Sequence, residues 1–163
     1  KILAEVEAVN EEQKDKLFEL ISRHFGGSLQ GKTFAVWGLS FKPNTDDMRA
    51  ASSRKLLASL WQAGARVQAF DPEAMHEAGR IFGHRDDLVL AATANAALQN
   101  ADALVVVTEW KNFRSPDFQL LKSHLADGVI FDGRNIYDPE SVEQAGLAYY
   151  GIGRGRSVAK AGA

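Results

Sequence analysis

From Thr33 onward the sequence alternates short, continuously apolar runs with segments that place apolar residues at helical spacing. The apolar runs are TFAVWG, RVQAFDP, LVLAA, ALVVVTEW, VIFDG and LAYYG. Short strands of this kind are typical of a parallel sheet buried on both faces, and the helical segments between them supply right-handed crossovers. We therefore expect an α/β fold, a Rossmann-like, doubly wound and mainly parallel sheet of about six strands flanked by helices.

The 163 residues divide into three expected parts. Residues 1–30 carry apolar residues at near-helical spacing and end in a basic turn followed by Gly26 and Gly27, which is the pattern of a long helix and its stop. Residues 31–152 hold the alternating pattern and are expected to form one domain with its own core. Residues 153–163 are small and basic, which predicts a flexible tail. The pattern leaves open whether the leading helix packs on the domain or connects it to another part.

Composition excludes several classes of function. The sequence has no cysteine, so these residues supply no disulfide, thiolate zinc site or thiol nucleophile. The net charge of −2 favours neither nucleic acid nor an anionic membrane as a partner. No apolar run approaches the roughly 20 residues of a membrane span. We expect a cytoplasmic location, and we interpret the chain, which begins at Lys1, as a fragment of a longer protein.

Metal and hydrolase chemistry find no support in the sequence. The histidines share no metal-ligand or triad spacing, and no serine lies in a GxSxG motif. They are His24, His76, His84 and His124. We therefore assign no catalytic residue and no metal ligand to this chain.

The candidate site is expected where the strands end, because ligands of an open α/β sheet bind outside the carboxyl ends of its strands. The first strand leads into a long charged loop, in which Gly38 permits a sharp turn. Lys42 and Arg49 there form a plausible anion site, with phosphate as the natural ligand. The alternative for either cation alone is a solvated loop charge. We expect Asp46 or Asp47 to cap a helix beginning near Arg49 rather than to act as a general base.

Later strand ends add further candidates at the same edge. Arg134 follows the VIF run directly after a turn at Asp132, and it is the second basic residue expected there. Asp71 ends another strand, but no GxGxxG precedes it, so we interpret it as a turn and cap residue instead of a ribose ligand. Trp110 could stack on a base or pack the rim of the crevice, and packing is the preferred interpretation.

The sequence resembles the C-terminal, UDP-binding domain of the UDP-glucose/GDP-mannose dehydrogenase family. The matching pieces are VWGLSFKPNTDDMRAASS, AFDP, ADALVVVTEW and VIFDGRNIYDP, which occur in the family's order between Gly31 and Tyr150. The segments FKPNTDDMR and VTEW are more similar to the UDP-glucose branch than to the GDP-mannose or UDP-N-acetylmannosamine branches.

The resemblance implies an NAD-dependent oxidation of UDP-glucose to UDP-glucuronate through a thiohemiacetal on a catalytic cysteine. That cysteine and the NAD-binding GxGxxG domain belong to the family's N-terminal half, so this chain alone is expected to be inactive and to act together with that half. On the resemblance, Phe41, Lys42 and Arg134 bind the UDP-sugar, with Lys42 at a phosphate. Arg49 reaches across the cleft to NAD. The leading helix resembles the end of a central helix that forms a homodimer.

Other classes of function stay open at this point. The chain could be a non-catalytic nucleotide-binding or dimerisation module that associates through its first helix. It could also be a self-sufficient NAD-binding enzyme, although the missing glycine motif argues against that. Within the family, GDP-mannose and UDP-N-acetylmannosamine are the alternative substrates.

Overall fold

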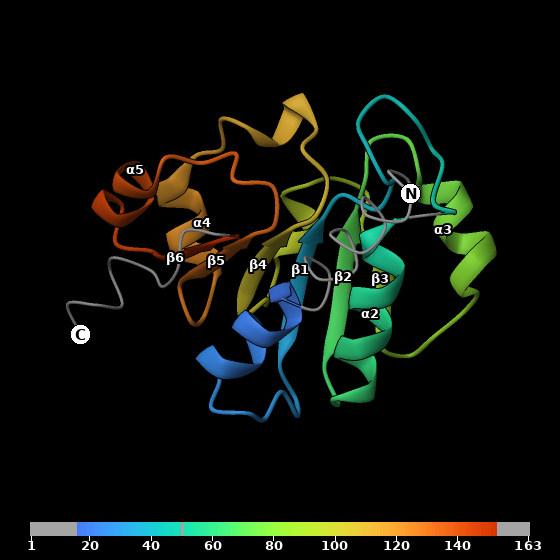
Figure 1. The fold of residues 1–163 in the computed structure, drawn as a ribbon, viewed down its shortest axis with the longest axis horizontal. Coiled ribbons are helices and arrows are strands. Elements are labelled where there is room, and N and C mark those ends of the chain that lie inside the picture. The colour runs from blue at the N-terminus through green and yellow to red at the C-terminus, as the bar shows by residue number, and fades with distance from the viewer. Residues whose placement is uncertain (1–15, 50, 153–163) are drawn as a thin grey trace, which may run out of the picture.

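A computed structural model describes residues 16–49 and 51–152 of the chain. Its six strands form one sheet in the order β3-β2-β1-β4-β5-β6, and all five neighbouring pairs are parallel (Figure 1). In chain order the elements are β1 (Thr33–Trp37), α2 (Ser52–Gln62), β2 (Arg66–Phe70), α3 (Met75–Phe82), β3 (Leu88–Leu90), η1 (Ala96–Leu98), β4 (Ala103–Val106), η2 (Lys111–Phe113), α4 (Phe118–His124), β5 (Val129–Asp132), α5 (Pro139–Gln144) and β6 (Ala148–Gly151). The predicted Rossmann-like, doubly wound fold is confirmed, because the chain adds β2 and β3 on one side of β1 and then β4, β5 and β6 on the other.

The sheet is buried on both faces, which explains why its central strands are apolar without alternation. Successive residues of β1 point to opposite faces, so that Phe34 and Val36 pack in one core cluster and Ala35 and Trp37 in the other. The first cluster includes α2 and the leading helical segment, and the second includes residues of η1, η2, α4 and α5. Two hydrophobic layers therefore fix the sheet between them.

The leading segment packs on the domain over the part that the structure describes. Residues 16–24 are helical, and Leu17 and Ile21 are buried in the first core cluster. The packing alternative left open by the sequence is therefore the one observed for these residues. The remainder of the long predicted helix, residues 1–15, and the predicted tail, residues 153–163, lie outside the described residues.

The beginning of α2 corrects a prediction, because neither Asp46 nor Asp47 caps this helix. The N-cap residue is Ala51, which makes no side-chain cap hydrogen bond, and the helix begins at Ser52. The Asp47 carboxylate instead accepts hydrogen bonds from the backbone N–H and the guanidinium of Arg49. A short Asp side chain that bonds two residues onward stabilises a turn in competition with a helix. This local turn delays the helix past the predicted start.

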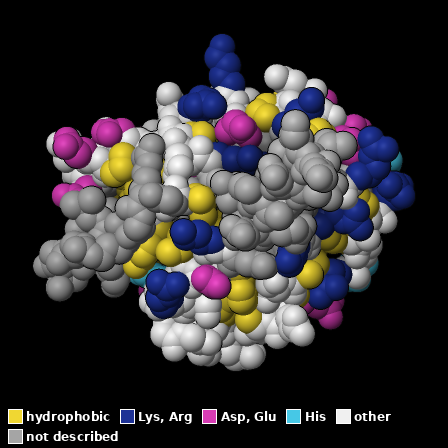
Figure 2. All heavy atoms as spheres, viewed as in Figure 1, with side chains coloured by type: hydrophobic (Ala, Val, Ile, Leu, Met, Phe, Trp, Pro, Cys, Tyr) yellow, Lys and Arg dark blue, Asp and Glu magenta, His cyan; other side chains and the backbone are white. Residues whose placement is uncertain are grey.

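Acidic and basic side chains gather at different ends of the molecule. Figure 2 shows acidic side chains around the α5 end and Lys and Arg side chains around the α2 and α3 end. At the latter end Arg54, Lys55 and Arg85 line a shallow hollow of about 680 Å³. None of the helices in residues 16–49 and 51–152 is both long enough and apolar enough to span a bilayer.

Gly38 provides the first testable consequence of this packing, because it leaves β1 at a φ of +101° with Thr108 directly against it. A Cβ at Gly38 would lie 2.5 Å from both the Cβ and the backbone N of Thr108. We expect Gly38→Ala to lower the free energy of unfolding by about 2–4 kcal/mol, measured by urea denaturation, since backbone strain and overlap add.

Gly27→Ala is the matched control. Gly27 also has a positive φ, +89°, but nothing lies within 4 Å of a Cβ added there. This variant should lose only the backbone contribution, about 1–2 kcal/mol. Equal losses for the two variants would show that the approach of Thr108 does not constrain the loop.

Candidate functional site

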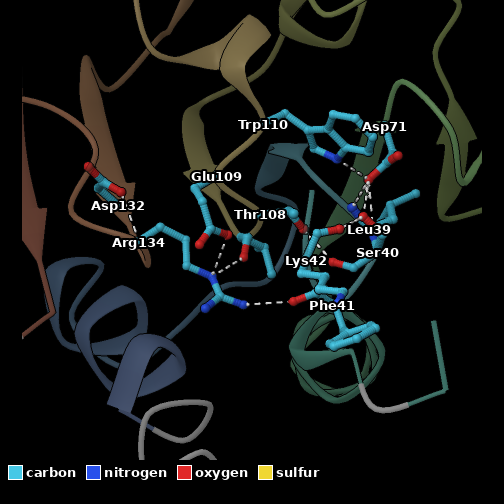
Figure 3. A network of polar contacts seen from close by, with 11 residues as sticks. Leu39, Ser40, Phe41, Lys42, Asp71, Thr108, Glu109, Trp110, Asp132 and Arg134 are labelled. Atoms are coloured by element: carbon cyan, nitrogen blue, oxygen red, sulfur yellow. Dashed lines mark hydrogen bonds and ion pairs between the residues drawn. The ribbon is translucent and has the colours of Figure 1, made fainter. Parts of the chain in front are cut away.

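The carboxyl ends of the parallel strands bring four loops to one edge of the sheet (Figure 1). They follow β1, β2, β4 and β5, and the loop after β1 is the longest of them because α2 begins only at Ser52. Figure 3 shows that the part of this loop from Leu39 to Lys42 lies between Asp71 on one side and Arg134 on the other. Each of these two residues fixes the loop by a different set of contacts.

Asp71 holds the first turn of the loop through one carboxylate oxygen. Its Oδ2 accepts hydrogen bonds from the backbone N–H of Leu39, at 2.7 Å, and of Ser40, at 3.0 Å. The indole Nε1 of Trp110 donates to the same oxygen at 3.0 Å, and the Ser40 hydroxyl lies 3.2 Å away. Asp71 is fully buried, so these charge-assisted bonds replace its hydration.

The other oxygen of Asp71 holds the segment that leads to α3. Oδ1 accepts the backbone N–H groups of Glu73, at 2.8 Å, and Ala74, at 2.9 Å. The interpretation of Asp71 as a turn residue is therefore confirmed, but Asp71 does not cap α3, whose N-cap residue is Ala74 with no side-chain cap hydrogen bond. Sequence reasoning missed its second role, which is to hold the β1 loop and Trp110. Trp110 packs as preferred, with only 5% of its surface exposed.

Lys42 lies exposed on a backbone that its neighbours restrain. The Ser40 hydroxyl is 2.9 Å from the carbonyl oxygen of Lys42, and the Thr108 hydroxyl donates to the carbonyl of Ser40. The Lys42 Nζ is 5.3 Å from the ring centroid of Phe41, and it forms no ion pair with any residue that the structure describes. Lys42 thus presents an exposed positive charge from a fixed loop.

Arg134 connects the ends of three strands through its guanidinium (Figure 3). Its Nε donates to the carbonyl oxygen of Val107 at 2.8 Å, and its Nη2 donates to the carbonyl oxygen of Phe41 at 3.2 Å. The Glu109 Oε1 lies 3.6 Å from the same Nε. Phe41 and Arg134, two residues predicted to share a site, are therefore brought into direct contact, and Lys42 is adjacent.

Asp132 is a second fully buried carboxylate, and it shapes the loop that presents Arg134. Its Oδ1 accepts the backbone N–H of Arg134 at 3.0 Å. Its Oδ2 accepts the backbone N–H of Tyr137, at 3.0 Å, and the hydroxyl of Tyr149, at 2.8 Å. Asp132 therefore fixes the backbone of the β5 loop by hydrogen bonds, as Asp71 fixes the backbone of the β1 loop.

Arg49 is separate from this group in the described structure. Its side chain is 88% exposed and pairs with Asp47 at 2.8 Å. The hydrogen bonds from Arg49 lower the pKa of Asp47 to about 2. Arg49 therefore has a local ion-pair partner in Asp47, and its exposed side chain still faces solvent.

The first backbone amides of the loop are not available to hold a phosphate. The N–H groups of Leu39 and Ser40 donate to Asp71, and that of Phe41 donates to the carbonyl of Asp47. In a glycine-rich dinucleotide turn such groups face the pyrophosphate. Side-chain cations are therefore the candidates to hold an anion at the start of this loop, and Lys42 is one that has no ion-pair partner among the described residues. The described residues also contain no cluster of His, Asp and Glu suited to a metal ion.

Fold and site together define a Rossmann-like domain with a cationic loop, in place of a glycine turn, at its strand ends. Residues 35–139 match the UDP-binding domain of the UDP-glucose/GDP-mannose dehydrogenase family. The chain belongs to this family.

Similar proteins support this assignment from both sequence and structure. The chain is 46% identical to the UDP-glucose 6-dehydrogenase of Pseudomonas aeruginosa over 96% of its own length and 35% of the relative's. It is 41% identical to that of Rhizobium meliloti, over 90% of the chain and 33% of the relative. A solved UDP-glucose dehydrogenase from Pyrobaculum islandicum superposes with a TM-score of 0.72 at 29% identity, covering 89% of this chain and 30% of that one. The chain thus spans about a third of the length of the curated relatives it matches.

Replacing Asp71 by Asn tests the role of its charge. The amide has one acceptor oxygen where the carboxylate has two, so at least one group of N–H donors loses its partner. We expect Asp71→Asn to lower the free energy of unfolding by about 3 kcal/mol. Asp102→Asn, which affects a single hydrogen bond from the Thr33 N–H, should cost less than about 1 kcal/mol. Similar costs in urea denaturation would contradict the central role of Asp71.

Tyr137 predicts how stability depends on alkaline pH. Burial, followed by the charge of Asp132, raises the pKa of Tyr137 well above its ordinary value. The folded state therefore favours the neutral phenol, and its stabilisation is complete below the unfolded pKa of about 10 and decreases as the pH rises further.

We expect Tyr137→Phe to make the free energy of unfolding less dependent on pH above 10. At neutral pH the variant should lose about 1 kcal/mol, because the Tyr137 hydroxyl donates to the Phe113 carbonyl at 2.6 Å. Urea denaturation at several pH values measures both effects. Parallel curves for wild type and variant would contradict this assignment. Burial also raises the pKa of Tyr150, so part of the pH dependence should persist.

Proposed function

We propose that this chain is the UDP-sugar-binding part of an NAD-dependent UDP-glucose 6-dehydrogenase, which oxidises UDP-glucose to UDP-glucuronate. The observation that carries the proposal is the exposed charge of Lys42, which has no ion-pair partner among residues 16–49 and 51–152, on a restrained loop beside Arg134, within the region that matches the UDP-binding domain. The names of the relatives support UDP-glucose over the alternative sugars. We propose that the protein acts in the cytoplasm, as expected from the sequence.

In this proposal the substrate's diphosphate binds at Lys42, and Arg134 and Phe41 complete the contact. A lysine is suited to a dianion because it acts as a compact point charge with three donors. Nη2 of Arg134 has a second hydrogen beyond the bond to Phe41, and Nη1 has two, so the guanidinium can bind a ligand while it holds the loop. The fixed backbone limits the entropy lost when substrate binds.

NAD fits this chain as a ligand at the margin of the site. The loop amides that would hold a pyrophosphate are bonded within the chain, whereas the Arg49 guanidinium is exposed and able to meet a phosphate. When bound, NAD supplies the hydride acceptor for the oxidation. We therefore propose that another part of the protein holds NAD and the catalytic cysteine, and that Arg49 contributes a contact across the cleft. We also propose a homodimer, which light scattering at several concentrations can test.

Lys42→Ala tests the proposed site directly. In isothermal titration with UDP and UDP-glucose, using the complete dehydrogenase, we expect the variant to bind roughly 30-fold more weakly, which is about 2 kcal/mol for a charge-assisted phosphate contact. Lys32→Ala is the control, since Lys32 precedes β1 at the opposite edge of the sheet and pairs with Asp127. Unchanged affinity in Lys42→Ala would remove Lys42 from the site, and equal affinity for GDP would contradict the preference for UDP.

A further inference from the structure

Glu109 carries a buried carboxylate oxygen with an unusual environment. It lies in the loop after β4, and its side chain as a whole is 33% exposed. Nevertheless its Oε1 is buried and accepts no hydrogen bond from any residue in the described ranges. A carboxylate oxygen that loses its hydration without gaining a hydrogen bond is unfavourable. A nearby positive charge is needed to offset this loss.

Arg134 supplies that charge. The distance of 3.6 Å from Glu109 Oε1 to Arg134 Nε is too long for a good hydrogen bond but short enough for an ion pair. Figure 3 shows the Glu109 carboxylate directed at the guanidinium, beside the contact with Phe41. The same guanidinium donates to Val107 and Phe41, so acceptors from two loops and the carboxylate surround it.

We propose that Glu109 is a positioning residue of the substrate site and that it acts through Arg134. Its negative charge holds the guanidinium against the carbonyl oxygens of Val107 and Phe41. This fixes the backbone of Phe41 and, with it, the position of the adjacent Lys42. The inference rests on the proposed function for its effect on substrate, but the restraint of Arg134 is a property of the ligand-free chain.

The geometry separates this role from two others. Direct contact with substrate through Oε1 is disfavoured, because that atom is buried and lies 3.6 Å from the Arg134 Nε. A major role in global stability is also disfavoured, since an ion pair whose side chains are 30% and 33% exposed contributes little to folding. The effect of Glu109 should therefore concern where Arg134 lies, and should disappear when Arg134 is absent.

A double-mutant cycle in the complete dehydrogenase tests the coupling. We expect Glu109→Gln to raise the KM for UDP-glucose about tenfold and to change kcat less than about threefold, with an unchanged midpoint of urea unfolding. In an Arg134→Ala background, Glu109→Gln should change KM by no more than about twofold. Glu140→Gln, which alters an acidic residue in the first turn of α5, is the control and should leave KM unchanged.

A second measurement needs no substrate. In this chain, NMR should show that Glu109→Gln accelerates the solvent exchange of the Arg134 Nε–H several-fold. Unchanged exchange, an unchanged KM, or additive effects of Glu109→Gln and Arg134→Ala would each overturn the positioning role. If Lys42→Ala leaves UDP affinity unchanged while the exchange rate responds to Glu109→Gln, the proposed function fails and the restraint of Arg134 by Glu109 stands.

Discussion

The buried carboxylate of Asp71 is the interaction on which the site depends. Its two oxygens accept five N–H groups, which come from the β1 loop, the segment before α3 and Trp110. In a dinucleotide turn the amides after the first strand are free for a pyrophosphate. Here an internal anion binds them instead. The loop is thereby fixed without ligand, and in the proposed function side chains instead of these amides bind the external anion.

Asp132 repeats this arrangement at the end of β5, and the two loops meet through Arg134. Asp132 fixes the backbone of Arg134, and the Arg134 guanidinium then contacts the carbonyl of Phe41. Each carboxylate is buried and hydrogen-bonded, so neither leaves its charge uncompensated. The site therefore depends on contacts between loops that are distant in sequence, because both strands deliver their loops to one edge of the sheet.

Much of this architecture was predictable from local patterns. Continuous apolar runs indicated the parallel sheet, and its topology then placed Lys42 and Arg134 at one edge. The cap of α2 was predicted wrongly, because the competing contact between Asp47 and Arg49 depends on loop geometry and not on residue type alone. The central role of Asp71 and the pairing of Glu109 with Arg134 were also missed. Both join residues that are far apart in sequence, and a strand-end acidic residue was the only signal available.

In the proposed function, this domain forms one half of a binding cleft, and the division between hydrogen-bonded and available polar groups agrees with that role. Buried polar atoms of the loops are largely bonded within the chain, whereas Lys42 and Arg49 extend from the same loop with their charges exposed. A few exposed cations attract a diphosphate, but they discriminate poorly between different sugars or bases, since point charges lack directional specificity. If the chain binds a nucleotide sugar as proposed, selectivity requires a second surface that closes over the ligand. Placing the cations on a preformed loop leaves that closure free to serve selectivity, because the loop need not be ordered at the same step.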